Sequence, residues 1–377
     1  MKKNYKVMIV IGTRPEAIKM ALLAKNNRKN NLPLKFVLCV TGQHREMLDQ
    51  VLDLFEIEPN MDLDIMSPNQ DLYDISSKLI LKLRDALKIE KPDLVLVHGD
   101  TTTTLIASLA AYYQKIDVGH VEAGLRTDSI YSPWPEEINR RLTSRLAKYH
   151  FAPTEFSKEI LLNECIEDSN ILVTGNTVID SLIWIKSKLE KDKKLREDIF
   201  NSIQEKGYKV DLSRKMVLIT GHRRENFGEK FLNVCEAIKY LAFKNPQVDF
   251  VYPVHLNPNV KKPVYAILSS LDNVHLIEPI DYASFVFLMI SSYLILTDSG
   301  GIQEEAPSLG KPVLVLRDTT ERPEAIKAGT CKLVGTNFDL IVKSVQNLLD
   351  NKKDYEAISN KENVYGDGNA TKKIIDF

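Results

Sequence analysis

Three carboxylates stand where predicted strands or loops give way to helices, which is the end of a parallel α/β sheet where ligands usually bind. Asp100 follows the apolar run Asp93–His98, Glu122 follows a shorter run, and Glu136 stands in a proline-stiffened loop at a helix start. Crowded carboxylates raise each other's pKa, so that one of them can hold a proton at neutral pH. The grouping predicts acid–base chemistry. The competing interpretation is that Asp100 only caps a helix and that Glu136 only favours a helix N-terminus.

The second half of the chain places cationic groups at a strand end. His222, followed by Arg223 and Arg224, comes directly after the apolar run Met216–Thr220. A lone histidine is more often structural than catalytic, but neighbouring guanidiniums favour the neutral imidazole that acid–base catalysis needs. We therefore expect His222 to take part in the chemistry.

Glycine-containing turns and arginines predict sites for a diphosphate. The turn that begins at Gly12 opens a helix with proline in its first turn, and its free amides would attract an anion. A Gly-Gly turn after the run Tyr293–Thr297 would let backbone amides approach a diphosphate closely, and Glu305, one turn on, would accept hydrogen bonds from a ribose diol. The alternative for the first turn is an ordinary strand-to-helix connection with a surface arginine. The residues expected around the diphosphate are Arg14, Lys19, Ser299, Gly300, Gly301 and Arg322.

Several nucleotide and hydrolase motifs are missing from the sequence. Gly310-Lys311 is followed by Pro312 instead of Ser or Thr, so it is not a Walker A loop. Thr297 stands where a nucleophile elbow requires glycine. No dinucleotide-binding fingerprint follows a strand, and His255 has no companion histidine at metal-ligand spacing. We expect neither a metal site nor a cofactor.

The elements that would position these side chains are short runs rich in Val, Ile and Leu, each followed by a turn and a helix-like stretch. Such runs, with little polar alternation, are typical of parallel strands covered by helices on both faces. We predict two Rossmann-like, doubly wound parallel-sheet domains, over residues 1–175 and 176–360. The runs include Lys6–Ile11, Lys35–Thr41, Asp93–His98, His150–Ala152, Ile171–Thr174, Met216–Thr220, Asp249–Val254, Tyr293–Thr297 and Pro312–Leu316.

Composition narrows the class of protein. The 377 residues suit two domains, and apolar and charged fractions of 44% and 27% are ordinary for a soluble protein. The formal net charge of −1 gives no basic field for nucleic acid or an anionic membrane. The four cysteines lack C-x-x-C spacing, which favours a reducing compartment, and no run is long enough to span a membrane. A cytoplasmic location follows.

Long segments of the sequence resemble the non-hydrolysing UDP-N-acetylglucosamine 2-epimerases, and the resemblance extends over essentially the whole chain. It implies a GT-B-like fold, with two domains facing across a cleft, and no redox cofactor. It also implies anti elimination of UDP from UDP-N-acetylglucosamine, giving a 2-acetamidoglucal, and re-addition to give UDP-N-acetylmannosamine. The matching segments include GTRPEAIKM at Gly12–Met20, HGDTTTT at His98–Thr104, GHVEAGLRT at Gly119–Thr127, SPWPEEINR at Ser132–Arg140, TGNTVID at Thr174–Asp180, TGHRREN at Thr220–Asn226, and the stretch Leu296–Ala325.

The same resemblance implies roles for single residues. Asp100, Glu122 and Glu136 would be the acid–base carboxylates, and His222 would assist the leaving diphosphate. Phe285 would contact the uracil, and Glu305 the ribose. Some family members bind a second UDP-N-acetylglucosamine as activator, for which the candidate residues are Gln43, His44, Arg223, Arg224 and His255. A homodimer is also implied, as is a C-terminal helix over residues 361–377 that returns to the first domain.

Three other functions stay open at this point. A hydrolysing epimerase would release free N-acetylmannosamine, and a GT-B glycosyltransferase would need an acceptor pocket in place of the carboxylates. A sugar-nucleotide sensor without activity is the third alternative, against which the joint presence of Asp100, Glu122, Glu136 and His222 speaks.

Overall fold

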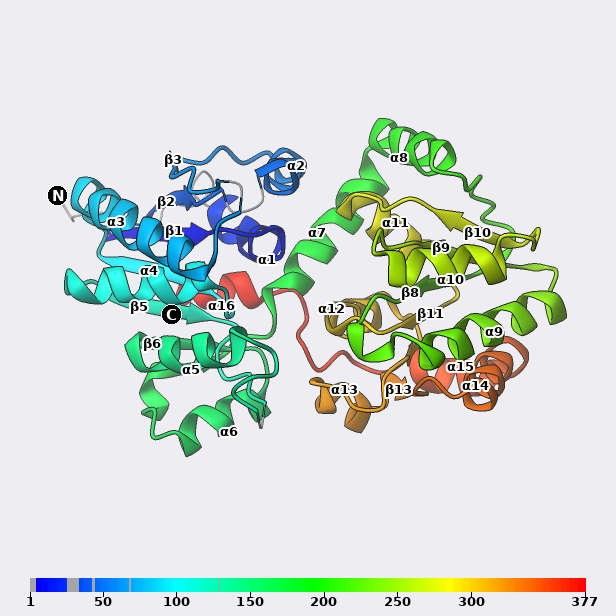
Figure 1. Ribbon diagram of the computed structural model, residues 1–377. Helices are drawn as coiled ribbons and strands as arrows, with labels where there is room; N and C mark the ends of the chain where they lie inside the picture. The colour runs from blue at the N-terminus through cyan, green and yellow to red at the C-terminus, as the bar shows by residue number, and fades with distance from the viewer. Residues whose placement is uncertain (1–4, 26–33, 43–44, 68, 128) are drawn as a thin grey trace. The chain divides into compact units, whose positions relative to one another are not determined.

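The computed structural model describes residues 5–25, 34–42, 45–67, 69–127 and 129–377, with only the backbone for residues 45–47. The chain divides into two compact units, and in Figure 1 the red C-terminal segment lies with the blue-to-green elements of the first unit. The first unit combines Met1–Ser181 with the C-terminal residues Tyr365–Phe377, and the second is Leu182–Val364.

A parallel sheet is the centre of the first unit, and its strand order within the described residues is β3-β2-β1-β4-β5-β6-β7. The direction of the order reverses between β1 and β4, and ligands of such sheets bind at the carboxyl ends of the strands at this point. The strands are β1 (Tyr5–Ile11), β2 (Leu34–Val40), β3 (Met61–Asp62), β4 (Leu94–His98), β5 (Asp117–Val121), β6 (Tyr149–Ala152) and β7 (Ile171–Val173).

Helices cover both faces of this sheet. Met8 and Val10 of β1 pack with Leu79 and Leu83 of α3 and with helix α4, so alternate side chains of each strand enter one apolar core. The opposite face lies toward α1 and the C-terminal α16, which pack against each other. The helices of this unit are α1 (Arg14–Lys25), α2 (Arg45–Phe55), α3 (Leu72–Glu90), α4 (Thr102–Tyr113), α5 (Glu136–Leu146), α6 (Glu155–Asn163), the short η2 (Asp168–Asn170) and α16 (Ala370–Asp376).

The second unit repeats the plan with the strand order β10-β9-β8-β11-β12-β13, all pairs parallel. Its order reverses between β8 and β11, so the turns after these two strands are where its ligands are expected. The strands are β8 (Lys215–Thr220), β9 (Val248–Pro253), β10 (Val274–Ile277), β11 (Leu294–Thr297), β12 (Val313–Val315) and β13 (Cys331–Leu333).

One face of the second sheet forms an extended apolar core with α9, α10 and α14, in which Phe250 and Leu296 are buried. On the other face α11 packs against β8 and α8. The helices are α8 (Lys193–Glu205), η3 (Arg224–Asn226), α9 (Glu229–Lys244), α10 (Pro258–Leu268), α11 (Tyr282–Ser291), α12 (Gly300–Glu305), η4 (Ala306–Leu309), α13 (Pro323–Ala328), α14 (Phe338–Asp350) and α15 (Lys352–Ser359).

The chain passes from the first unit to the second within α7 (Thr177–Lys191) and returns at Tyr365. The buried carboxylate of Asp180, in the first turn of α7, accepts hydrogen bonds from the backbone N–H groups of Ala370 (3.2 Å) and Thr371 (2.7 Å) at the start of α16. Residues 176–181 therefore lie with the first unit, beyond the range 1–175 expected from the sequence, and residues 361–364 lie with the second.

The prediction of two doubly wound parallel α/β domains is confirmed. Among the residues that the structure describes, no helix combines the length and the apolar character needed to cross a membrane.

Candidate functional site

Asp100 lies just beyond the carboxyl end of β4 and is held by a buried arginine of α5. The Arg140 guanidinium donates from Nη2 to Asp100 Oδ2 at 2.5 Å, and Asn139 Nδ2 donates to the Asp100 backbone carbonyl at 2.9 Å. The cap of α4 is Thr101, whose side chain accepts from the Thr104 N–H at 3.1 Å. Asp100 is therefore not the helix cap considered as its alternative role, and its carboxylate is directed at α5.

Glu122 follows β5 with φ of 63°, a left-handed conformation that costs a residue with a side chain about 1–2 kcal/mol. Its Oε2 accepts hydrogen bonds from Lys19 Nζ of α1 and, at 2.7 Å, from Asn176 Nδ2. A Cβ placed on Gly99 would lie 3.8 Å from Glu122 Oε1, so the carboxylate faces the residue that precedes Asp100. The turns after β4 and β5 thus bring these two acids together.

Glu136 is the first residue of α5 and stands one turn before Arg140, on the same side of the helix. Its Oε2 is buried without a hydrogen-bond partner among the described residues, and the structure contains no ligand or water. Its neighbour Glu137 is fully buried and structural, accepting from the Thr127 N–H at 3.0 Å and from Arg141 Nε at 2.6 Å. The three predicted carboxylates therefore meet at one edge of the first sheet.

The turn after β1 differs from the prediction that its amides are free to bind an anion. Glu16 Oε2 accepts from the backbone N–H groups of Gly12 (2.9 Å) and Thr13 (2.7 Å), while Oε1 accepts from the Thr101 hydroxyl at 2.7 Å. These two amides are therefore used by a carboxylate of the protein itself, which also accepts from the Thr13 hydroxyl at 2.9 Å. Of the two cations expected here, Arg14 is the first residue of α1 and Lys19 lies further along the same helix.

His120 supports the turn after β4, which carries Asp100. Its fully buried ring donates from Nε2 to the Gly99 carbonyl at 2.7 Å. Burial lowers the pKa of His120 to about 3, so the ring is neutral in the folded protein. It fixes the backbone that leads into Asp100.

In the second unit, Asp298 organises the turn after β8. This buried residue follows β11 and accepts at Oδ2 from the backbone N–H groups of His222 and Arg223, both at 2.8 Å. The His222 ring stacks on His255 with centroids 5.3 Å apart. Partial burial lowers the pKa of His222, although the nearby Asp298 opposes the shift, while Arg223 and His255 add to it. The predicted neutral imidazole is consistent with this environment.

The Gly-Gly turn after β11 begins α12, as predicted, and an arginine lies beside it. A Cβ on Gly300 would stand 3.9 Å from the Arg322 guanidinium, which is hydrogen-bonded through Nε to the buried Glu304. Glu305 accepts at Oε2 from the Tyr282 hydroxyl at 2.6 Å. Together with Ser299 and Gly301, the Gly300 turn and the Arg322 guanidinium therefore lie where the strand order of this sheet reverses. The partly buried Phe285 lies on α11, the helix that carries Tyr282.

The residues named for a second nucleotide-sugar are divided. Arg223, Arg224 and His255 lie on the turns after β8 and β9, with His255 stacked on His222. Gln43 and His44 fall outside the described residues.

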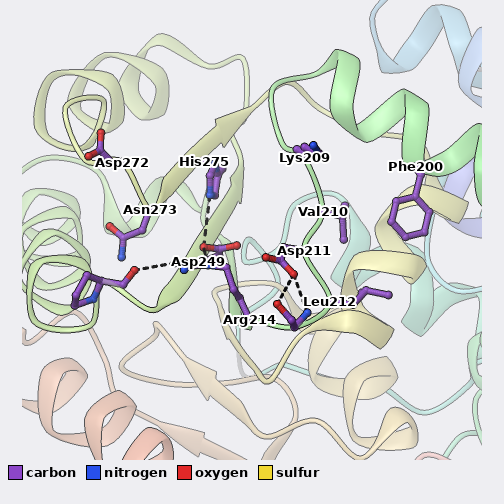
Figure 2. Close-up of a pocket in the computed structure, with 12 residues that line it drawn as sticks. Phe200, Lys209, Val210, Asp211, Leu212, Arg214, Asp249, Asp272, Asn273 and His275 are labelled. Carbon is purple, nitrogen blue, oxygen red and sulfur yellow. Dashed lines mark hydrogen bonds and ion pairs between the residues drawn. The ribbon is translucent and has the colours of Figure 1, made fainter.

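A cavity of about 940 Å³ in the second unit is separate from these side chains (Figure 2). Its lining residues Arg214, Asp249 and Asn273 stand at the amino ends of β8, β9 and β10, which is the opposite edge of the sheet. Asp249 is satisfied there by Arg214 Nε at 2.7 Å and the Tyr208 hydroxyl at 3.1 Å. This cluster closes the sheet edge and is structural.

Four residues that matter for the geometry are absent from the sequence-based prediction of the site, namely Glu16, Arg140, Asn176 and Asp298. Arg140 has a sequence signal, because it stands four residues after Glu136 on a predicted helix. Asp298 stands at a predicted strand end like Asp100. Asn176 lies 54 residues from its partner Glu122, so no local pattern reveals that contact.

The chain has two doubly wound parallel sheets. Acids lie where the strand order of the first sheet reverses, and a glycine turn with cations lies at the corresponding place in the second. These features define the class of α/β enzymes with a GT-B-like fold. The family described as UDP-N-acetylglucosamine 2-epimerase matches residues 6–377. The chain is 54% identical over 372 residues to a UDP-N-acetylglucosamine 2-epimerase of Campylobacter jejuni, covering 99% of this chain and 97% of that one. It is 57% identical over 373 residues to that of Neisseria meningitidis serogroup A, covering 98% of each.

A solved structure extends the likeness to three dimensions. The UDP-GlcNAc 2-epimerase from Neisseria meningitidis, bound to UDP-GlcNAc, superimposes with a TM-score of 0.89 at 56% identity and 98% coverage of both chains. The chain belongs to the UDP-N-acetylglucosamine 2-epimerase family and is an enzyme of the isomerase class. The predicted family membership is confirmed.

Proposed function

We propose that the protein interconverts UDP-N-acetylglucosamine and UDP-N-acetylmannosamine by inverting C2 of the sugar. The observation that carries the proposal is the meeting of Asp100, Glu122 and Glu136 at the carboxyl edge of the first sheet, with Lys19 and Arg140 as their basic partners. Inversion at C2 needs a group that removes a proton from one face and a group that delivers one to the other. A set of carboxylates is suited to both tasks.

The proposed reaction is an anti elimination of UDP across C1–C2, which gives a 2-acetamidoglucal, followed by re-addition of UDP after C2 has gained a proton on the opposite face. The C2 hydrogen is only weakly acidic, so the departing diphosphate must be stabilised while the proton leaves. Asp100, Glu122 and Glu136 carry the proton transfers.

We assign the contacts with the leaving diphosphate to cationic side chains and backbone amides. His222 is held by the backbone contacts of Asp298 and has a lowered pKa, so it is suited to donate a hydrogen bond from a neutral ring. Glu305, fixed by Tyr282, is assigned to the ribose, and Phe285 to the uracil. The residues assigned to the phosphates are Arg14, Lys19, Ser299, Gly300, Gly301 and Arg322.

Activation by a second UDP-N-acetylglucosamine is part of the proposal, through Gln43, His44, Arg223, Arg224 and His255. The stacked contact between His255 and His222 supports it, because a ligand at His255 would touch the residue assigned to the leaving group. Activation predicts sigmoidal kinetics and no turnover of UDP-N-acetylmannosamine until UDP-N-acetylglucosamine is added. Hyperbolic turnover of UDP-N-acetylmannosamine alone would contradict it.

We further propose a cytoplasmic homodimer whose product supplies N-acetylmannosamine-derived units for cell-surface polysaccharide. The dimer is tested by light scattering, which should return twice the 42.9 kDa of one chain. A mass of one chain would contradict it.

The chemistry is tested by incubating the protein with UDP-N-acetylglucosamine in D₂O and following C2 by NMR. The proposal requires deuterium at C2 and a mixture of both UDP-sugars. Stoichiometric free UDP and free sugar would indicate a hydrolysing enzyme instead, and UDP release only with an added acceptor would indicate a glycosyltransferase. Binding of the UDP-sugar without any deuterium exchange at C2 would indicate a sugar-nucleotide sensor without activity.

A further inference from the structure

Asn176 stands where the two connections between the units come together in the first unit. Its backbone N–H donates to the Tyr365 carbonyl at 2.7 Å, at the residue where the chain re-enters this unit. The neighbouring glycines touch, since a Cβ on Gly366 would lie 3.2 Å from the Gly175 Cα. Both glycines have positive φ, 88° and 120°, so the close crossing of the two segments depends on their lack of a side chain.

The side chain of Asn176 has one fixed orientation. Its Oδ1 accepts from the Val178 N–H at 3.0 Å, which caps the first turn of α7. The carboxamide must then present its NH₂ group on the other side, where Nδ2 donates to Glu122 Oε2 at 2.7 Å. Asn176 is 2% exposed, so this contact is shielded from water.

Three groups lie close to one oxygen of the Glu122 carboxylate. Oε2 receives Lys19 and Asn176, and His98 Nε2 lies 3.6 Å from it. Oε1 faces Gly99, the residue before Asp100. Lys373 of α16 donates to the Thr174 carbonyl at 3.2 Å, so a cation of the returning segment also contacts this crossing. The Asn176 carboxamide is therefore one of the groups that orient this carboxylate.

We propose that Asn176 is a positioning residue for Glu122. It fixes the orientation of the Glu122 carboxylate and links it to the place where the two connecting segments cross, at Gly175 and Gly366. The inference rests on the proposed function, because it gives Glu122 a part in the proton transfers. The Asn176 side chain contacts the Glu122 carboxylate through Nδ2 and the backbone of α7 through Oδ1, and it acts through that carboxylate. A change in the backbone at the crossings would move the carboxamide and, with it, Glu122.

The test is Asn176→Asp, with Asn337→Asp as its matched control. Aspartate is as good a helix cap as asparagine, so the cap of α7 is kept, but the donor to Glu122 becomes a second carboxylate. Asn337 caps α14 in the same way, accepting from the Leu340 N–H at 2.9 Å, and has no part in the proposed site. For each protein, C2 deuterium incorporation is measured from pH 6 to 9, together with the KM for the UDP-sugar and the unfolding transition.

We expect Asn176→Asp to lower kcat by at least about tenfold while KM changes by less than about threefold, because a lost positioning contact acts on the chemical step. Two facing carboxylates share a proton, so the exchange rate of this variant should also recover as the pH rises. Asn337→Asp should keep the wild-type rate and pH profile. A second variant, Asn176→Ser, keeps a capping oxygen and brings no charge, so it should lose rate without the change in pH profile.

The outcomes separate the two proposals. A wild-type protein that incorporates no deuterium overturns the proposed function. Wild-type exchange together with an unchanged rate and pH profile in Asn176→Asp overturns the positioning role alone, as does a loss in both Asn176 variants that only follows their loss of folded protein.

Discussion

Arg140 and Asp100 are joined by a hydrogen bond of 2.5 Å that links α5 to the end of β4. The guanidinium is almost entirely buried, and its Nη1 also lies 3.5 Å from Glu137. A planar, permanently charged group between two acids fixes their geometry in a way that a flexible ammonium does not. The position of Asp100 at the acidic edge therefore depends on a residue 40 positions away in the sequence.

Arg140→Lys should lower the rate of C2 exchange by about 10–100-fold with a smaller change in KM, since the forked contact is replaced by a single point charge. Steady-state exchange kinetics provide the measurement. The matched control is Arg141→Lys on the next position of α5, where the guanidinium bonds Glu137 at 2.6 Å instead of Asp100. Equal losses in both variants would contradict a specific role for the contact with Asp100.

Arg322→Ala should weaken UDP binding and also destabilise the fold, because it removes the cation beside the Glu304 carboxylate, which is 1% exposed. Removing one partner of a buried ion pair costs about 3–5 kcal/mol. Adding Glu304→Gln should recover much of the free energy of unfolding but not the affinity for UDP, as measured by urea unfolding and calorimetry. If the double variant binds UDP like the wild type, the phosphate role of Arg322 is wrong.

The stability of the protein should fall as the pH is lowered from about 6.5 towards 3, in part through His120. Its pKa is about 3 in the folded protein and 6.5 as a free side chain, so within this window the unfolded chain binds a proton that the folded chain does not. The free energy of unfolding therefore rises with pH, by up to about 1.4 kcal/mol per pH unit for this residue. Burial also lowers the pKa of His150, to about 4, which adds a term of the same sign.

His120→Gln isolates this contribution, because glutamine can still donate to the Gly99 carbonyl but does not titrate. Urea unfolding at several pH values between 4 and 7 should give a shallower pH dependence for the variant, by about one proton. An unchanged slope would show that His120 is not the buried neutral group described above.

Glu16→Gln should destabilise the first unit and slow C2 exchange. The buried carboxylate accepts from the N–H of Thr13 and the hydroxyl of Thr101 through different oxygens, and an amide offers only one acceptor. We expect a loss of about 1–3 kcal/mol in the free energy of unfolding. Glu155→Gln, at an exposed first-turn glutamate of α6, is the control and should change the stability by less than about 0.5 kcal/mol.

The sequence predicted the sheets well where strands are long and buried. The runs at Lys6–Ile11 and Met216–Thr220 became β1 and β8, because consecutive apolar residues are required when both faces are covered. The two-residue β3, and β10 with its histidine, were not among the runs singled out, since such short or mixed stretches have no distinctive pattern. Their pairing is decided by neighbours already in the sheet.

For the site, the sequence predicted which residues stand at strand ends but not how they are held. That Asp100 and Glu122 lie together follows from the shared edge of parallel strands, whereas Glu136 is placed by helix α5, which also carries Arg140. The sequence does not reveal that Glu16 accepts hydrogen bonds from the Gly12 and Thr13 amides, because a glutamate three positions into a helix is equally compatible with a ligand-binding turn. Long-range partners such as Asn176 for Glu122 require the folded chain.

The return of residues 365–377 to the first unit has a consequence for synthesis on the ribosome. The amide contacts from α16 to Asp180, and the edge contact of the Phe377 ring with Phe151 at 5.8 Å, come from residues that are translated after the whole of the second unit. Domains generally fold as units during translation. All residues of the second unit, which end at Val364, are therefore synthesised before the first unit is complete, although the residues of the first unit up to Ser181 precede them in the chain.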